Sequence, residues 1–237
     1  DFIQAGVNCT VFLADWHTLL NDKLGGSFEN IRKVSKYYED AFKLVCPGVN
    51  IVLGTDLYDS KKEYWSELVQ IAKHMSLART MRTLTIMGRS ENDEKIDLAK
   101  LLYPAMQAAD IHSLDLDIVH AGMDQRKIHM LVKDVFPKMK WKVPVAVHHG
   151  LLPGLTDPGF VVGGVPAEEV KEQKQTKMSK SNPNAGIFIQ DSDAEIRNKI
   201  NHAFCEIPGG IFGKAKNVPE LNPILQIAID TGCHRYN

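Results

Sequence analysis

The chain has 237 residues, of which 44% are hydrophobic and 24% charged, a composition typical of a globular protein with a sizeable buried core. Its formal net charge of −1 excludes a strongly basic nucleic-acid coat, so any contact with nucleic acid depends on a local patch. No apolar run reaches the roughly 18 residues of a membrane-spanning helix.

The first half of the chain alternates between predicted strands and helices. Apolar and β-branched runs predict strands at 9–14 and 50–56, and helical spacing predicts a helix over 27–45 with Ser27 as its N-cap. A long helical stretch follows over about 62–87. Another is predicted over 97–114, where Pro104 should kink the helix or start a new one.

The same alternation continues with strands at 115–122 and 142–150 and a helix over 124–136 between them. Alternating strands and helices predict an α/β fold with a doubly wound parallel sheet. Ligands bind such sheets at the carboxyl ends of the strands. That rule selects Asp15, His17, Asp56, Gly122 to Gln125, and His148 to Leu152.

The segment from Leu152 to Asn184 is rich in Gly and Pro and then in charge, which indicates a long functional loop. Helical order returns at 191–205, with an Asp or Ser cap and Glu195 near the third position.

Cysteine and histidine spacing argues against a metal centre. The cysteines lie far apart without a C-x-x-C pair, which is typical of reduced thiols in a cytosolic protein: Cys9, Cys46, Cys205 and Cys233. No H-E-x-x-H occurs among the nine histidines. We therefore expect no protein-bound metal. We also expect a cytoplasmic location, because the first residues lack the features of a secretory signal.

The stretch "KMSKS" at 177–181 places Lys177, Ser179 and Lys180 on the long loop. Two ammonium groups and neighbouring hydroxyls can bind a polyphosphate and stabilise the charge that develops in phosphoryl or nucleotidyl transfer. Taken alone, the composition fits an ordinary solvated loop equally well.

Two further stretches carry polar side chains at the predicted strand ends or on a helix. In "YPAMQAADIH" the spacing puts Tyr103, Gln107 and Asp110 on one helix face, among small apolar residues. In "AGMDQRK" Gly122 allows close approach of a backbone, Asp124 offers a carboxylate to a ribose and Gln125 an amide. A capped polar helix face and a plain strand-to-helix turn are the alternatives for the two stretches.

Together, the stretches "FLADWH", "YPAMQAADIH", "GMDQRKIHM", "HHGLLPGL" and "KMSKS" resemble, in order and spacing, the tyrosyl-tRNA synthetases of class I, most closely the archaeal and eukaryotic type. The resemblance runs over about residues 1–206. It implies a Rossmann-like catalytic domain over 1–206 with a helical dimer-interface insertion at about 75–112 and the KMSKS loop at 171–184. Residues 207–237 would then be a linker and the start of a helical anticodon-binding domain.

The resemblance also implies roles for individual residues. Tyr103, Gln107 and Gln125 match the residues that hold the amino group of tyrosine, and Asp110 matches the acceptor of its phenolic hydroxyl. The strand-end residues that line the tyrosine pocket are matched by Leu13, Ala14 and His17. The ATP contacts are matched by Gly122 and Asp124 on the ribose side and by Lys177, Met178, Ser179 and Lys180 on the loop. Further implied are ATP with Mg²⁺, tRNA(Tyr) as partner and a homodimer.

The family's first signature, His-x-Gly-His near the amino terminus, does not occur in this sequence. We expect that the sequence omits the beginning of a longer protein, and we expect the anticodon-reading domain to continue beyond its end. The basic residues Lys73, Arg79, Arg82 and Arg89 fit a tRNA acceptor arm, a dimer interface or a solvated helix face.

Three alternatives stay open at this point. Tryptophanyl-tRNA synthetases share the fold, although their pocket does not need the carboxylate of Asp110. A non-catalytic, tRNA-binding relative would bind no ATP, and an unrelated nucleotidyltransferase would use ATP without tyrosine.

Overall fold

The computed structural model describes residues 2–87, 96–152, 154–155 and 182–203. The chain divides into two compact units, Asp1–His149 and Gly150–Asn237, and each is described by itself. The predicted domain division at residue 206, and the predicted dimer insertion over 75–112, stay predictions.

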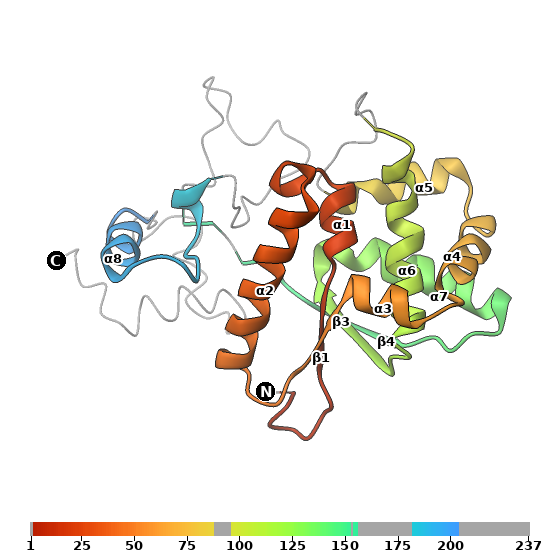
Figure 1. Ribbon diagram of the computed structural model, residues 1–237, viewed down its shortest axis with the longest axis horizontal. Coiled ribbons are helices and arrows are strands. Elements are labelled where there is room, and N and C mark those ends of the chain that lie inside the picture. The colour runs from red at the N-terminus through yellow and green to blue at the C-terminus, as the bar shows by residue number, and fades with distance from the viewer. Residues whose placement is uncertain (1, 88–95, 153, 156–181, 204–237) are drawn as a thin grey trace, which may run out of the picture. The chain divides into compact units, whose positions relative to one another are not determined.

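One or more helices separate each strand of the first unit from the next (Figure 1). In chain order they are β1 (Thr10–Leu13), α1 (Asp15–Leu20), α2 (Phe28–Val45), β2 (Asn50–Leu53), α3 (Gly54–Ser60), α4 (Tyr64–Lys73), α5 (Leu77–Thr83), α6 (Tyr103–Ser113), β3 (Ile118–Gly122), α7 (Arg126–Val135) and β4 (Val145–His149). The described part of the second unit contains α8 (Asp193–Asn201). Short 3₁₀ turns lie at Lys23–Gly26, Leu84–Met87, Ala99–Leu102, Met123–Gln125, Phe136–Met139 and Pro183–Ala185.

All four predicted strands are present, and those in the described ranges form two parallel pairs. β1 pairs with β2, so that Leu13 lies opposite Leu53 at their carboxyl ends. β3 pairs with β4 and brings Gly122 opposite His149. Helices connect the members of each pair, as parallel strands require. Each pair therefore brings two carboxyl ends together, where the sequence predicted a ligand site.

Local signals predicted several helix starts correctly. The Ser27 side chain accepts a hydrogen bond from the backbone N–H of Asn30 and begins α2. Pro104 stands in the first turn of α6, where its missing N–H costs no hydrogen bond. Ser192 and Glu195 form a reciprocal capping box at the start of α8.

The prediction of one long helical stretch over about 62–87 was wrong, because the structure has several shorter elements there. The chain forms α4, then α5, then a 3₁₀ turn. Ser76 causes the break, because its backbone is extended at φ −84° and ψ 153° and its side chain accepts from the backbone N–H of Arg79. A residue in that conformation starts a new helix.

The strand predicted over 50–56 was also too long, because it ends at Leu53 and α3 begins at Gly54. The buried Asp15 carboxylate accepts a hydrogen bond from the Thr55 N–H in the first turn of α3. That contact spans 40 residues and leaves no signal in the local sequence.

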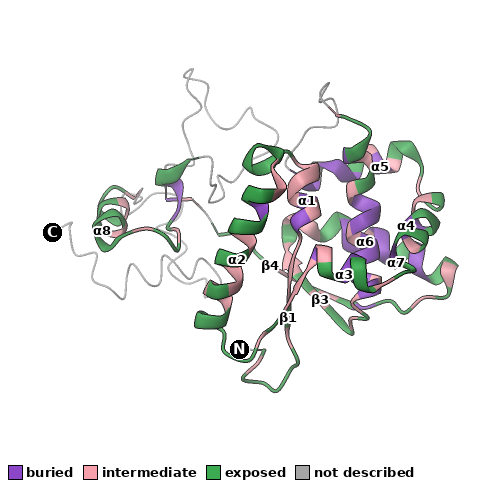
Figure 2. Ribbon diagram, viewed as in Figure 1, coloured by how far each residue is buried: buried purple, intermediate pink, exposed green. Residues whose placement is uncertain are grey.

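The core of the first unit centres on α6, on which buried residues are concentrated in Figure 2. Eight of its eleven residues are buried, and α4 and α7 pack against it. Small side chains at Ala105, Ala108 and Ala109 allow this close approach. Any polar side chain on α6 that faces these neighbours is consequently removed from water. None of the helices in the described ranges has the length and apolarity to cross a membrane.

Candidate functional site

Asp15 joins the carboxyl ends of β1 and β2. It is 1% exposed, and its Oδ1 accepts from the backbone N–H groups of Trp16 at 2.9 Å and Thr55 at 3.1 Å. Its Oδ2 accepts from the Thr55 hydroxyl at 2.5 Å. A Cβ on Gly54 would lie 2.5 Å from Oδ1, so this close approach requires glycine. The carboxylate fixes the starts of α1 and α3, from which His17 and Tyr58 extend.

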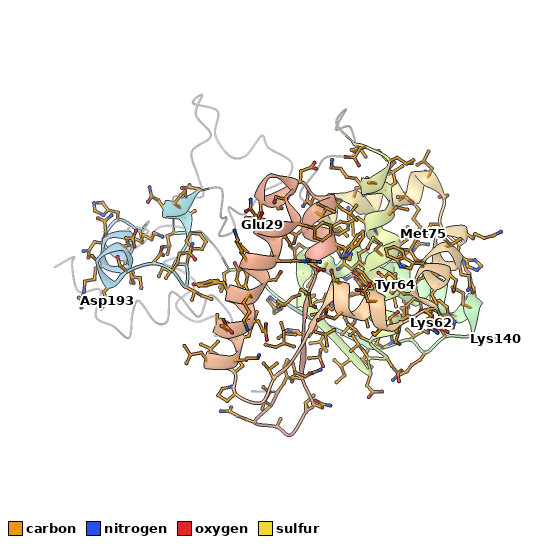
Figure 3. All side chains as sticks on the ribbon, in the orientation of Figure 1. Glu29, Lys62, Tyr64, Met75, Lys140 and Asp193 are labelled. Atoms are coloured by element: carbon orange, nitrogen blue, oxygen red, sulfur yellow. The ribbon has the colours of Figure 1, made fainter. Side chains whose placement is uncertain are left out.

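Asp110 lies inside the unit on α6 and is 3% exposed. The hydroxyl of Tyr64, the first residue of α4, donates a hydrogen bond of 2.8 Å to its Oδ1. Figure 3 labels Tyr64, whose ring lies in the interior of the unit and is 0% exposed. The other carboxylate oxygen, Oδ2, lies 3.5 Å from Nε2 of His17.

Several buried polar atoms in this region have no hydrogen-bond partner among the described residues. They are Oδ2 of Asp110, both ring nitrogens of His17, the hydroxyl of Tyr58 and Oε1 of Gln107. Buried polar groups in folded proteins almost always have a partner, and leaving one unsatisfied costs about 1–3 kcal/mol. Their occurrence in one region is typical of a site that binds a polar ligand.

Burial determines the protonation of the two ionisable groups that face each other. It raises the pKa of Asp110 to about 7, and the hydroxyls of Tyr64 and Tyr58 oppose this rise. Burial also lowers the pKa of His17 to about 4, so its ring is neutral at pH 7. The site thus contains a carboxylate that titrates near neutral pH beside an uncharged imidazole.

The predicted polar face of the helix over 97–114 is present on α6. The Tyr103 ring meets the edge of the His17 ring at a centroid distance of 4.6 Å. The Gln107 side chain donates a hydrogen bond of 3.1 Å to Oε1 of Gln125. Burial and the neighbouring carboxylates of Asp110 and Asp124 raise the pKa of Tyr103 to about 12, which keeps its hydroxyl protonated.

The remaining predicted site residues lie at the strand ends or outside the described residues. Leu13 ends β1, and Ala14, which is half-buried, follows it. Gly122 ends β3, and the half-buried Asp124 lies in the 3₁₀ turn that leads to Gln125. The loop residues Lys177, Met178, Ser179 and Lys180 fall outside the described part of the chain.

A cationic cavity of about 600 Å³ lies between α5 and α7. Its lining combines four basic side chains with apolar and hydroxyl groups: Arg79, Arg82, Thr83, Met123, Arg126, Lys127 and Met130. Arg79 pairs with Asp134 at 2.5 Å, and the Lys127 ammonium donates to the Arg82 carbonyl at 3.3 Å. Two of the four basic residues that the sequence singled out therefore line a cavity. Of the others, Lys73 is exposed and Arg89 is not described.

Sequence reasoning missed the aromatic residues that surround Asp110. Tyr64 and Tyr58 stack at a centroid distance of 4.1 Å and an angle of 28°. Tyr64 and Asp110 are 46 positions apart, and nothing in the local pattern "KKEYW" distinguishes this tyrosine from an ordinary core residue.

Within the described ranges, no three His, Cys, Asp or Glu side chains converge as metal ligands would.

Comparison with known proteins adds independent findings. The family described as tRNA synthetases class I (W and Y) matches residues 1–232. A tyrosine–tRNA ligase of Thermococcus sibiricus is 46% identical over 224 residues, which make up 86% of this chain and 59% of that protein. The tyrosine–tRNA ligase of Saccharolobus islandicus is 42% identical over 240 residues, covering 100% of this chain and 64% of that protein. This chain therefore spans about three fifths of the length of these relatives.

Among solved structures, the tyrosyl-tRNA synthetase of Pyrococcus horikoshii complexed with L-tyrosine superposes with a TM-score of 0.77 at 42% identity. The match covers 86% of this chain and 59% of that one. It confirms the predicted Rossmann-like α/β fold class.

Proposed function

Because the chain belongs to the class I tRNA synthetases of the tryptophan and tyrosine group, as its motifs predicted, we propose that the whole protein is a tyrosine–tRNA ligase. The reaction condenses L-tyrosine with ATP to tyrosyl-adenylate and then transfers tyrosine to the 3′ end of tRNA(Tyr). We place this activity in the cytoplasm.

The observation that carries the proposal is the buried carboxylate of Asp110, one oxygen of which has no hydrogen-bond partner among the described residues. A phenolic hydroxyl is a donor and satisfies this acceptor. Phenylalanine offers no donor and would leave Oδ2 of the buried carboxylate without a hydrogen bond. The known case of such discrimination is a tyrosyl-tRNA synthetase, roughly 100,000-fold against phenylalanine, a magnitude that belongs to that family.

The amino end of the substrate has partners one turn away along α6. Gln107 and Gln125 meet through their amide groups, and Oε1 of Gln107 is buried without a partner in the described chain. An ammonium group is the donor that this oxygen needs. We assign the α-amino group of tyrosine to Gln107, Gln125 and Tyr103, with His17, Leu13 and Ala14 lining the pocket.

ATP would bind at the carboxyl end of β3. Gly122 allows the backbone to approach, and Asp124 offers a carboxylate to the ribose hydroxyls. Lys177, Met178, Ser179 and Lys180 would contact the pyrophosphate, where ammonium and hydroxyl groups stabilise the charge of the transition state. Magnesium would arrive with the nucleotide, since Mg²⁺ is usually held through substrate phosphates and few protein ligands.

For the tRNA partner, the cationic cavity between α5 and α7 is the supporting feature, because phosphate contacts rely on such clustered Arg and Lys side chains. For a homodimer, support comes from apolar side chains in the predicted insertion. Leu77 is 66% exposed and Leu98 81% exposed. An interface between two copies of the chain would remove both side chains from water.

Tryptophan is the second candidate substrate, because the matching family includes synthetases for both amino acids. Indole has one N–H donor, and its larger ring system would have to fit the same pocket. The partnerless carboxylate of Asp110 favours the phenol, whose hydroxyl is the smaller and more acidic donor.

Amino-acid-dependent pyrophosphate exchange tests the proposal in the intact protein. We expect exchange with tyrosine and none measurable with tryptophan or phenylalanine. Asp110→Asn should lower kcat/KM for tyrosine roughly 100-fold, because a hydrogen bond to a charged group is lost. Asp117→Asn is the matched control, since the Asp117 side chain is 90% exposed and pairs with Lys142 at the surface. Exchange driven by tryptophan, or full activity of Asp110→Asn, would refute the assignment, and absence of ATP binding would indicate a non-catalytic relative.

A further inference from the structure

We infer that Tyr64 is a positioning residue for substrate selection, because its hydroxyl occupies one oxygen of Asp110 and so directs the other oxygen to the substrate hydroxyl. This inference rests on the proposed function and deepens it. Tyr64 lies in none of the sequence stretches that resemble the synthetase family.

The position of the Tyr64 hydroxyl is fixed on all sides. The side chain is 0% exposed, its ring stacks on Tyr58 at 4.1 Å, and the edge of Trp65 meets it at 5.2 Å. The hydroxyl lies 2.8 Å from Oδ1 of Asp110 and 3.4 Å from the Met106 carbonyl. A hydroxyl has one proton to donate, and the shorter contact to an anionic acceptor takes it.

This single hydrogen bond makes the two oxygens of the carboxylate unequal. The terminal torsion of an aspartate is broad and nearly two-fold, so a carboxylate without fixed partners can exchange its oxygens. Tyr64 holds Oδ1 toward α4, and Oδ2 is then left 3.5 Å from His17 with no hydrogen-bond partner in the described chain. A phenol bound there meets a preorganised acceptor that needs no reorientation.

The charged and titratable groups around Asp110 make this hydroxyl important for ionisation. Its neighbours are His17 and Asp15 from α1, Tyr58 from α3, Tyr64 from α4 and Tyr103 on α6 itself. His17 is neutral at pH 7, and Asp15 carries a like charge that disfavours ionisation. Within this set, the Tyr64 hydroxyl, which donates to Oδ1 at 2.8 Å, is the group that most stabilises the ionised carboxylate. Removing the Tyr64 hydroxyl should therefore favour the protonated, non-accepting form.

The test is tyrosine binding by Tyr64→Phe, measured calorimetrically from pH 6 to pH 9. The variant keeps the ring and its packing and loses only the hydroxyl. At pH 7 we expect the Kd for tyrosine to rise about tenfold. The pH at which binding is half-maximal should move upward, while binding of phenylalanine should change little. Tyr37→Phe is the matched control, because Tyr37 is an exposed tyrosine of α2.

A double-mutant cycle with Asp110→Asn separates positioning from packing. If Tyr64 acts through Asp110, Tyr64→Phe should have little further effect on tyrosine binding once Asp110→Asn is present. An equal effect in both backgrounds, or an unmoved pH midpoint, would overturn the inference. Undiminished tyrosine binding by Asp110→Asn alone would instead overturn the proposed function, so the two failures are distinguishable.

Discussion

Lys100 and Asp110 are buried to the same extent, 3% exposed each, and are held in opposite ways. The Lys100 ammonium contacts the carboxylates of Asp97 and Asp22, the latter at 2.6 Å, and its backbone N–H donates to Asp97 at 2.9 Å. Asp110 has the Tyr64 hydroxyl on one oxygen and no hydrogen-bond partner among the described residues on the other.

The difference shows how a buried charge that supports the fold can be told from one that serves binding. Burial of a charge is tolerated where opposite charges and hydrogen bonds saturate it, as around Lys100. Among the described residues the Asp110 carboxylate has no neighbouring cation, since His17 is neutral, and burial raises its pKa. An unsaturated buried charge of this kind marks a functional site.

The largest expected effect on stability comes from Lys100. Lys100→Ala should lower the free energy of unfolding by about 2–3 kcal/mol, because it removes a buried four-carbon stem; the carboxylates of Asp22 and Asp97, 63% and 54% exposed, remain solvated. Urea denaturation measures the loss, and the Kd for tyrosine should stay within about twofold. Lys33→Ala, in an exposed pair with Glu29, is the control and should show no measurable change. Weakened tyrosine binding by Lys100→Ala would break the distinction between the two sites.

The pH dependence of the free energy of unfolding should reveal the raised pKa of Asp110. Its pKa is raised from 3.8 to about 7, so the folded state binds this proton more tightly than the unfolded state does. The resulting stabilisation is complete below about pH 4 and is lost as the pH rises through 7. Between pH 5 and pH 8, the free energy of unfolding of the ligand-free protein should fall relative to Asp110→Asn by on the order of 2 kcal/mol.

The titration of His17 changes the free energy of unfolding with pH in the opposite direction. Because both proteins contain His17, its contribution cancels when the protein is compared with Asp110→Asn. Its pKa is lowered to about 4, so the neutral ring stabilises the fold above pH 6.5, and this stabilisation is lost as the pH falls toward 4. Urea titrations of both proteins at each pH provide the measurement. Parallel curves for the two proteins would mean that Asp110 titrates normally.

Asp15 is a third buried charge and resembles Lys100, because both of its carboxylate oxygens accept hydrogen bonds. Thr55→Val keeps the shape of the side chain and removes the hydroxyl that donates to Asp15 and accepts from the Trp16 indole N–H, which should cost about 1–2 kcal/mol in thermal or urea unfolding. Thr55→Ser retains the hydroxyl and should recover most of this stability. If both variants were equally unstable, the methyl group and not the hydrogen bond would be responsible.

The same contrast explains what the sequence could predict. Signals that lie within a few residues were readable: Ser27 and Ser192 as helix caps, Pro104 as a helix start, and Tyr103, Gln107 and Asp110 on one face of α6. Contacts between distant residues were not. The start of α3 at Gly54 depends on Asp15, and the partner of Asp110 is Tyr64, 46 residues away. These contacts follow from packing of α1, α3 and α4, which periodicity does not encode.

We expect the smallest effect on stability from substitution of Asp22, the more exposed of the two carboxylates that pair with Lys100. The Asp22 side chain is 63% exposed and its backbone adopts φ 53°, a conformation that Asn tolerates as well as Asp. Asp22→Asn should therefore change the free energy of unfolding by less than about 0.5 kcal/mol, because Asp97 still pairs with the ammonium. Asp22→Val should cost more than 1 kcal/mol, roughly the strain of a β-branched residue at positive φ. If Asp22→Asn proved as damaging as Lys100→Ala, the buried ammonium would need both carboxylates, and saturation by two partners would be the requirement for burying it.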